Sequence, residues 1–277
     1  MTVGGNGTRP ADTLLAARVG DMLRVAERGE CAVSPFLTPQ ERVRTEQQLA
    51  RAGVTESAVF WGGYTGAERR RLYLLPSYLL SVPELLPPQD TDPVTNPAGV
   101  VGREDAVAAV RIEGSGFREL THRDYLGSLL SLGLERDVLG DIAVQDAHTA
   151  VVFCTARVAE FLPGALERVA SDRVRCRIYL PDADFTDGRR TVPVSDTVAS
   201  SRLDCVVAAL TGKSRESARE AITDGLVEVD YLTEERPDRS LTPPVMLSVR
   251  GVGKFRLLPF GGETKKGRLR LMAEKFV

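Results

Sequence analysis

Residues 201–231 have the sequence SRLDCVVAALTGKSRESAREAITDGLVEVDY, which predicts a helix, a basic turn, a second helix and a short strand. Four apolar residues share the i, i+3, i+4, i+7 spacing of one helical face: Leu203, Val206, Val207 and Leu210. Ser201 is the expected N-cap of the first helix, and Asp204 favours a helix N-terminus. Gly212 interrupts the pattern, so we expect the helix to end there.

The second helix is expected to run from an N-cap at Ser214 to about Asp224, with Gly225 as a left-handed cap. Val227 and Val229 then alternate as a strand. Three cations border the apolar stripe of the helix pair: Lys213, Arg215 and Arg219. A basic edge beside a buried stripe suits a small module that presents cations to a phosphate backbone.

Three short motifs occur here at fixed spacing: Arg202-Leu203-Asp204, Ser214-Arg215 and Ile222-Thr223-Asp224-Gly225-Leu226-Val227-Glu228-Val229. Over about thirty residues this pattern resembles the S4 RNA-binding domain. The family usually has Asn-Gly after the strand, whereas this chain has Asp230-Tyr231. We expect this departure to remove a turn signal and to place a carboxylate near the basic surface.

The charges are distributed unevenly along a chain whose formal net charge is −2. Residues 1–90 hold 10 basic and 10 acidic side chains, residues 91–200 hold 12 and 17, and residues 201–277 hold 14 and 11. All five lysines lie in the last segment. Charge alone favours a solvated face in an arginine-rich sequence, but the position of the cations in a helix pair favours RNA.

Several classes of protein are disfavoured by composition. The four cysteines have no C-x-x-C spacing and there are only two histidines, so we expect no metal site and a reducing, cytoplasmic location. No apolar run approaches the ~18 residues of a membrane helix, so no membrane contact is expected. The opening MTVGGNGTRP lacks the apolar core of a signal peptide.

The sequence predicts an α+β protein of three small domains. These are an N-terminal α/β domain (14–86), a central ferredoxin- or RRM-like βαββαβ domain (98–190) and a C-terminal S4, or αL-like, domain (197–277). A disordered tail (1–13) and a proline-rich linker (87–97) complete the organisation.

Two features of the first two domains bear on RNA contact. Arg69, Arg70 and Arg71 precede an apolar strand, where they either touch phosphate or, more commonly, form a solvated strand edge. In the central domain, RRM proteins stack bases on aromatic residues of the inner strands, and Phe153 is the only strand aromatic suited to that role. We therefore expect a domain with the RRM shape that does not read bases in the RRM manner.

The C-terminal domain continues with two strands around Gly251-Val252-Gly253 and a basic, glycine-flanked turn at 261–268. Backbone contacts of its cations would recognise RNA by shape and position. The candidate RNA-binding residues are Arg202, Lys213, Ser214, Arg215, Arg219, Arg250, Lys254, Lys265, Lys266 and Arg268.

Further motifs extend the resemblance beyond S4: Gly62-Gly63-Tyr64, Ala67-Glu68-Arg69, Thr121-His122-Arg123-Asp124-Tyr125-Leu126-Gly127, Gly140-Asp141-Ile142, Ser248-Val249-Arg250-Gly251 and GGETKKGRLR at 261–270. With them, residues 35–277 resemble the YlmH-type family of S4 proteins. This resemblance implies a bacterial protein of ribosome-associated quality control. It also implies binding to rRNA of the large ribosomal subunit, with tRNA as a further partner.

Two other classes of function stay open. An RNA-modifying enzyme, of pseudouridine synthase or methyltransferase type, would use S4 for targeting and would need a catalytic site among His122, Arg123, Asp124 and Asp141. His122-Arg123-Asp124 copies a kinase triplet, but capping of a helix explains it better. A protein-interaction scaffold is favoured by the acidic segment 91–200. The leading prediction is a monomeric RNA-binding protein that is not an enzyme and needs no cofactor.

Overall fold

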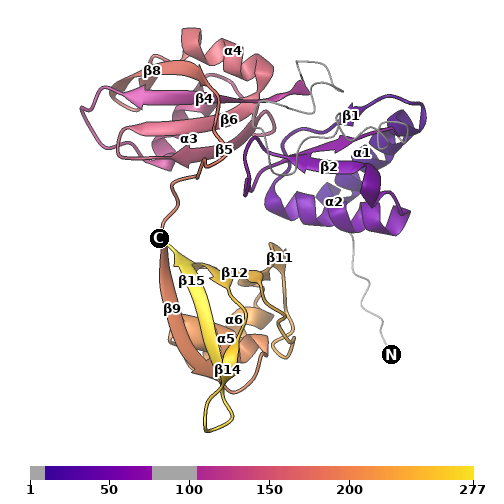
Figure 1. The fold of residues 1–277 in the computed structure, drawn as a ribbon, viewed down its shortest axis with the longest axis vertical. Coiled ribbons are helices and arrows are strands. Elements are labelled where there is room, and N and C mark those ends of the chain that lie inside the picture. Colours follow the sequence, from indigo (N-terminus) through magenta and orange to yellow (C-terminus); the bar gives the residue numbers. More distant parts are fainter. Residues whose placement is uncertain (1–9, 77–104) are drawn as a thin grey trace. The chain divides into compact units, whose positions relative to one another are not determined.

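The computed structural model describes residues 10–76 and 105–277 of the chain, which has six α-helices and three β-sheets in these ranges. The chain divides into two compact units, with the boundary between Gly188 and Arg189, and each unit is described by itself (Figure 1). The predicted linker at 87–97 and the first nine residues of the predicted tail lie outside the described residues. No helix in the described part of the chain is long and apolar enough to cross a membrane.

The N-terminal region packs two helices against a small antiparallel sheet. Its helices are α1 (Pro10–Glu27) and α2 (Pro39–Ala52). Its strands are β1 (Ala32–Val33), β2 (Ala58–Trp61) and β3 (Arg71–Leu74), in the order β1-β3-β2, and a 3-10 turn, η1 (Thr55–Ser57), precedes β2. The helix α1 begins four residues before the predicted start at Leu14, because Pro10 is suited to a first helical position. Residues 10–13 of the predicted tail are therefore helical.

The helix α2 begins where the sequence predicts, with a capping box at Thr38. The Thr38 hydroxyl accepts from the Glu41 amide (3.2 Å), and the Glu41 carboxylate accepts from the Thr38 amide (2.8 Å). One core holds the helices on the sheet, and it is formed by Leu15, Val19, Met22, Ala32, Leu37, Leu49, Leu72 and Leu74.

The arginine run at 69–71 is neither a solvated strand edge nor a set of exposed cations. Arg69 donates to the carbonyls of Leu139 (2.9 Å) and Phe36 (3.1 Å). Arg71 is buried and donates to the Ser34 carbonyl (2.7 Å). Both guanidiniums are therefore bound to backbone oxygens of other segments of the chain. The alternatives raised by the sequence were therefore both wrong for Arg69 and Arg71.

Residues 105–180 form a five-stranded sheet with the strand order β5-β6-β4-β8-β7. Its strands are β4 (Val107–Gly114), β5 (Leu139–Val144), β6 (Thr149–Thr155), β7 (Arg168–Val169) and β8 (Asp172–Tyr179). Its helices are α3 (His122–Ser131) and α4 (Ala156–Ala165). The element order contains the predicted βαββαβ series, with the two-residue β7 added. Both helices pack on one face of the sheet, over side chains that include Val110, Ile112, Val152 and Cys154.

The opposite face of this sheet is partly covered by segments from outside it. Phe153 of β6 is fully buried, with its ring 4.7 Å from that of Tyr64 and 5.4 Å from that of Phe185. A base cannot stack on Phe153 because these two rings already occupy its surroundings. Phe153, the one strand aromatic that the sequence suits to stacking, is therefore not accessible to a base.

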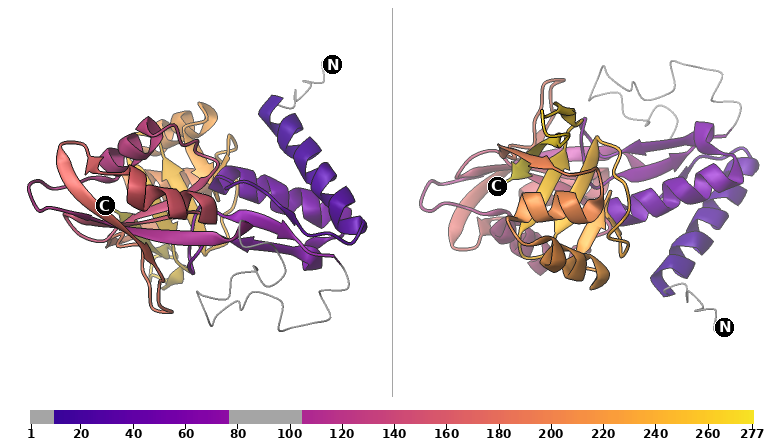
Figure 2. Two further views of the ribbon diagram at one scale, coloured as in Figure 1. Left: turned by 90° about the horizontal axis from the view of Figure 1, so that it is seen from above. Right: turned by 90° about the horizontal axis from the view of Figure 1, so that it is seen from below.

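The second unit is a seven-stranded antiparallel sheet with two helices, α5 (Leu203–Thr211) and α6 (Arg215–Thr223), on one face (Figure 2). Its strands are β9 (Thr191–Val198), β10 (Val227–Val229), β11 (Leu232–Thr233), β12 (Val245–Val249), β13 (Gly253–Leu257), β14 (Gly261–Glu263) and β15 (Leu269–Phe276). The sequence did not predict β9, which lies beside β15 over its full length (Figure 1). It begins six residues before the predicted domain start at 197.

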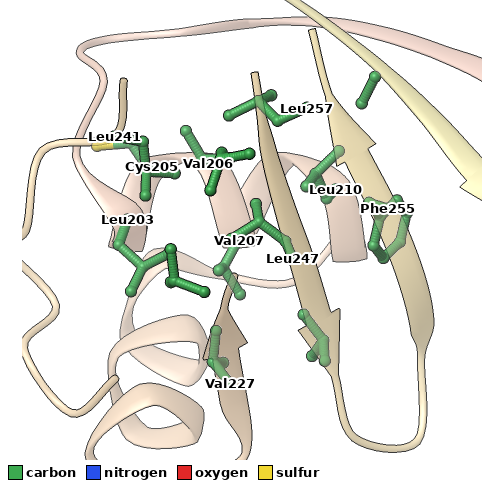
Figure 3. Packing of buried hydrophobic residues seen from close by; sticks show 14 of the residues in the cluster. Leu203, Cys205, Val206, Val207, Leu210, Val227, Leu241, Leu247, Phe255 and Leu257 are labelled. Atoms are coloured by element: carbon green, nitrogen blue, oxygen red, sulfur yellow. The ribbon is translucent and has the colours of Figure 1, made fainter. Parts of the chain in front are cut away.

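The predicted apolar stripe of α5 forms the centre of this unit's core. Val206, Val207 and Leu210 face Leu247 and other strand residues, as Figure 3 shows. All three helix residues are less than a tenth exposed. The amphipathic spacing read from the sequence therefore positions the helix pair on the sheet.

Substitution of Gly63 tests how tightly the covered face of the central sheet is packed. A Cβ on Gly63 would lie 2.3 Å from the Phe153 ring, whereas a Cβ on Gly66 would meet nothing within 4 Å. Both glycines have positive φ, +100° and +89°. We expect Gly66→Ala to reduce the free energy of unfolding by about 1 kcal/mol and Gly63→Ala by about 2–4 kcal/mol, since only the second adds overpacking.

Urea unfolding followed by the fluorescence of Trp61, the single tryptophan, measures both variants. Equal losses in the two variants would show that Phe153 adjusts to the added methyl group and that the packing is loose.

Candidate nucleic-acid interface

The helix α5 begins at a cap made by a distant loop. Arg202, not the predicted Ser201, is the N-cap residue, and its side chain makes no capping bond. The Leu203 amide donates to the Arg239 carbonyl (2.8 Å), and the Asp204 amide donates to the Pro237 carbonyl (2.9 Å). The loop thus replaces a side-chain cap, which is why local sequence placed the cap wrongly.

Glu234 holds this capping loop in place. Its carboxylate is buried and accepts from Arg236 Nε (2.9 Å) and Arg239 Nη1 (2.7 Å). The hydrogen bond from Arg236 is the main reason that the pKa of Glu234 falls to about 2, and Arg239 adds to the effect. The loop is therefore fixed by an ionised carboxylate at neutral pH.

Asp204 organises the first two cations of the candidate site. Its side chain is fully buried, with 0% exposure. Arg202 donates to both carboxylate oxygens (3.2 and 3.1 Å), and Arg215 donates twice to Oδ2 (3.1 and 3.0 Å). Burial raises the pKa of Asp204, but the hydrogen bonds from Arg202 and Arg215 outweigh it and leave the pKa below the ordinary value.

The two arginines are held without being removed from solvent. Their side chains are 36% (Arg202) and 51% (Arg215) exposed. The structure therefore brings together two predicted site residues, which are thirteen positions apart in sequence, on one carboxylate. Asp204 is more than the helix-start carboxylate that its sequence position predicts.

The start of α6 agrees with the prediction. Ser214 is the N-cap, and its hydroxyl accepts from the Ser217 amide (3.1 Å), so this predicted site residue has a structural role. Lys213 precedes the cap and Arg219 lies one turn along α6, and both are exposed. As predicted, three cations lie at the start of α6 and along its first turns: Lys213, Arg215 and Arg219.

The turn Asp230-Tyr231 closes a two-residue hairpin despite the missing Asn-Gly. Both residues have positive φ, 48° and 67°, and β10 pairs with β11 around them. The Asp230 carboxylate accepts from the Met246 amide (2.9 Å). The carboxylate is thus engaged by the backbone, and the turn forms although its usual sequence signal is missing.

Two further predicted site residues belong to the neighbouring strands: Lys254 lies on β13, and Arg250 lies in the turn that precedes β13. The Lys254 ammonium lies 4.8 Å from the centre of the Tyr231 ring and 5.8 Å from that of Phe276. Arg250 is exposed in the turn between β12 and β13, where its amide donates to the Leu226 carbonyl (2.9 Å). Lys254 is therefore held by aromatic rings on the sheet.

The predicted basic turn is the tip of the β14–β15 hairpin. The Thr264 amide donates to the Arg268 carbonyl (2.8 Å), and Lys265 and Lys266 are exposed at the tip. Arg268 turns back to the sheet and donates to the hydroxyl (3.0 Å) and the carbonyl of Thr197. The two lysines are available to a partner, while Arg268 is bound to β9.

Sequence reasoning predicted Lys254 as a site residue but missed that it lies in a group of cations around Phe276 on the outer sheet face. The charged groups of Arg189, Lys254 and Arg256 lie 5.5–5.8 Å from the centre of this ring. The alternation of residues in 269–276 is the signal that could have placed Phe276 on this face.

Two of the four residues considered for catalysis, Asp124 and Asp141, have structural partners. Asp124 forms a capping box with Thr121 at the start of α3. Asp141 accepts from the amides of Glu68 (2.7 Å) and Arg69 (3.0 Å) and from the Tyr64 hydroxyl (2.8 Å). Within residues 10–76 and 105–277, no group of three His, Cys, Asp or Glu side chains is placed to hold a metal ion.

Comparisons with known proteins agree with an RNA-binding role. Residues 106–180 match the family model described as "Putative RNA-binding domain in YlmH", and residues 15–79 match the model "YlmH, N-terminal". The "Ribosome-associated protein quality control protein P2" of Bacillus subtilis (strain 168) is 29% identical over 257 residues, which cover 91% of this chain and 90% of that protein.

A solved structure, "Cell division protein ylmH from Streptococcus pneumoniae", is similar with a TM-score of 0.46 and 15% identity. The match covers 61% of this chain and 92% of that chain.

Asp204→Asn tests the buried carboxylate. Because the pKa of Asp204 is lowered in the folded protein, its ion pairs stabilise the protein above the ordinary pKa and are lost as the pH falls through the lowered value. We expect the variant to lose about 1–3 kcal/mol at pH 7, a range reduced for the exposure of both arginines, and less at pH 3.

The measurement is urea unfolding followed by the amide NMR signals of α5 and α6 at both pH values. Asp224→Asn, at the exposed C-cap of α6, is the control and should stay within about 0.5 kcal/mol of the wild type. The same loss at pH 3 and pH 7 would mean that the charge of Asp204 contributes nothing.

Proposed function

The chain belongs to the YlmH family, and we propose on this basis that it is a ribosome-associated protein that binds structured RNA through the unit 189–277. The observation that carries the proposal is the arrangement at the start of α5 and α6. There, buried Asp204 fixes two arginines beside the exposed Lys213 and Arg219. Cations held in place lose less conformational freedom when they bind phosphate.

The unit 189–277 is proposed to be an S4 domain. Its helix pair, the strand that follows and the basic hairpin occur in the order that the resemblance implies. The central residues 106–180 have the sheet order and the helix placement of a ferredoxin-like domain. We propose that these two domains and the N-terminal α/β region make up the three-part organisation.

The RNA is proposed to be rRNA of the large ribosomal subunit, with tRNA as a further contact. Cations on a helix edge and on a hairpin tip bind the phosphate backbone, which carries little sequence information. Structured RNA recognised by its shape is the target that such contacts fit. A role in ribosome-associated quality control, here of stalled translation, is also proposed, and the name of the Bacillus subtilis relative supports its ribosome-associated part.

The protein is further proposed to act without catalysis. The two carboxylates weighed for an active site, Asp124 and Asp141, are engaged by hydroxyl and backbone groups. These partners favour structural roles over the alternative of an RNA-modifying enzyme.

Lys213→Glu with Arg219→Glu tests the site without disturbing the fold. Neither side chain contacts Asp204, whereas Arg215→Glu would place a second carboxylate against a buried one. We expect the double variant to lose co-sedimentation with large ribosomal subunits, because four units of charge change at the phosphate-facing edge.

The matched control is Arg190→Glu with Arg270→Glu, which makes the same charge change at exposed positions of the same unit away from the helix pair. It should sediment nearly as the wild type does. Loss in the control alone, or in neither variant, would contradict the proposed site.

The salt dependence gives an independent measure. With about four to six phosphates neutralised, log K should fall with log salt at a slope of roughly −3 to −5. A titration of wild-type protein with rRNA measures this slope, and a flat response would exclude an electrostatic contact.

A further inference from the structure

The strand β8 carries a row of arginines on the sheet face that α3 and α4 leave open. Val174 and Cys176 pack against the helix-side core, so the alternate residues Arg173, Arg175 and Arg177 point to the other face. All three are exposed. At about 3.4 Å per residue, the row extends over about 14 Å.

The neighbouring strands add two more arginines to this face. In the pairing register, Arg111 of β4 lies opposite Arg177, and Arg168 of β7 lies opposite Arg173. Directly opposite residues of an antiparallel pair share a face. The open-face arginines are therefore Arg111, Arg168, Arg173, Arg175 and Arg177.

One carboxylate of these strands lies among them. Glu113 accepts from Arg111 Nε (2.8 Å) and from Arg177 Nη2 (2.8 Å). Within the part of the chain that the structure describes, no hydrogen bond or ion pair holds the side chain of Arg173 or Arg175. The part of the open face that β4, β7 and β8 form is thus basic, although residues 91–200 together hold 17 acidic against 12 basic side chains.

We propose that this arginine face of β4, β7 and β8 is a second RNA-binding surface, which contacts backbone phosphates through guanidinium groups. The surface lies within the residues that match the YlmH RNA-binding model, and no residue of it was expected to bind RNA from sequence. It adds to the proposed function, and its residues are separate from those of the helix pair.

Phosphate contact fits this face better than base stacking does. The aromatic part of the sheet is closed, because Tyr64 and Phe185 cover Phe153. Tyr179, at the end of the arginine row, has the Arg111 guanidinium 5.8 Å from its ring centre. A planar guanidinium forms two parallel hydrogen bonds with a phosphate, so a row of them matches a nucleic-acid backbone.

Arg173→Gln with Arg175→Gln in the full-length protein tests the proposal. Both changes leave Glu113 with its two partners, so the fold should be kept. The probe is a fluorescently labelled RNA hairpin, and anisotropy gives its affinity between about 50 and 200 mM salt. We expect binding to weaken about tenfold and the salt slope to become shallower by about 1.5–2, because two phosphate contacts are removed.

The control Arg123→Gln with Arg157→Gln removes the same charge from exposed positions on α3 and α4 of the same domain. It should bind the hairpin within about twofold of the wild type. A second variant, Glu113→Gln, should bind about threefold more tightly, because it removes the carboxylate that neutralises two guanidiniums.

Unchanged binding in Arg173→Gln with Arg175→Gln would overturn the inference and would assign the face to another partner, such as an acidic protein. An equal loss in the α3 and α4 control would also overturn it, since the effect would then be one of overall charge. In the same assay, Lys213→Glu with Arg219→Glu separates the two proposals. A loss of binding in that variant alone supports the helix-pair site and contradicts the arginine face. A loss in Arg173→Gln with Arg175→Gln alone supports the arginine face and contradicts the helix-pair site.

Discussion

The buried carboxylate of Asp204 is the constraint on which the C-terminal unit depends. A charge with no exposed surface is tolerated only when it is paired, and here two guanidiniums from different helix starts supply the pairing. The amide of Asp204 is in turn bound to Pro237 of the loop that Glu234 holds. The geometry of the two helices, the loop and the basic edge is therefore one connected arrangement of ion pairs and backbone bonds.

The structure separates arginines that build the fold from cations that remain available. Arg71 is buried on backbone carbonyls, and Arg268 is tied to Thr197. Lys213 and Lys265 are exposed, with long side chains extending from turns. Counting basic residues along the sequence treats these groups alike, because the partner of each one comes from a distant part of the chain.

Local structure could be predicted because its causes are local. Thr38 and Thr121 form capping boxes with residues three positions ahead, so the starts of α2 and α3 follow from the sequence. The strand β9 was missed because Pro193 and Asp196 interrupt the alternation of its valines, and its order comes from pairing with β15 more than seventy residues later. In the candidate site, the sequence predicted which basic residues belong to the helix pair, but not that Arg202 and Arg215 both pair with the buried carboxylate of Asp204.

The central domain has the sheet arrangement of RRM proteins, but its open face offers arginines in place of aromatic residues on which bases could stack. Its average charge is acidic, which argues against nucleic acid only if every face has that average. The pleat of β8 places its arginines on one side and its apolar residues on the other, so that a single strand carries a basic surface. Because Tyr64 closes the aromatic part of the same face, the remaining surface offers charge and hydrogen bonds, and phosphate is the RNA group that matches both.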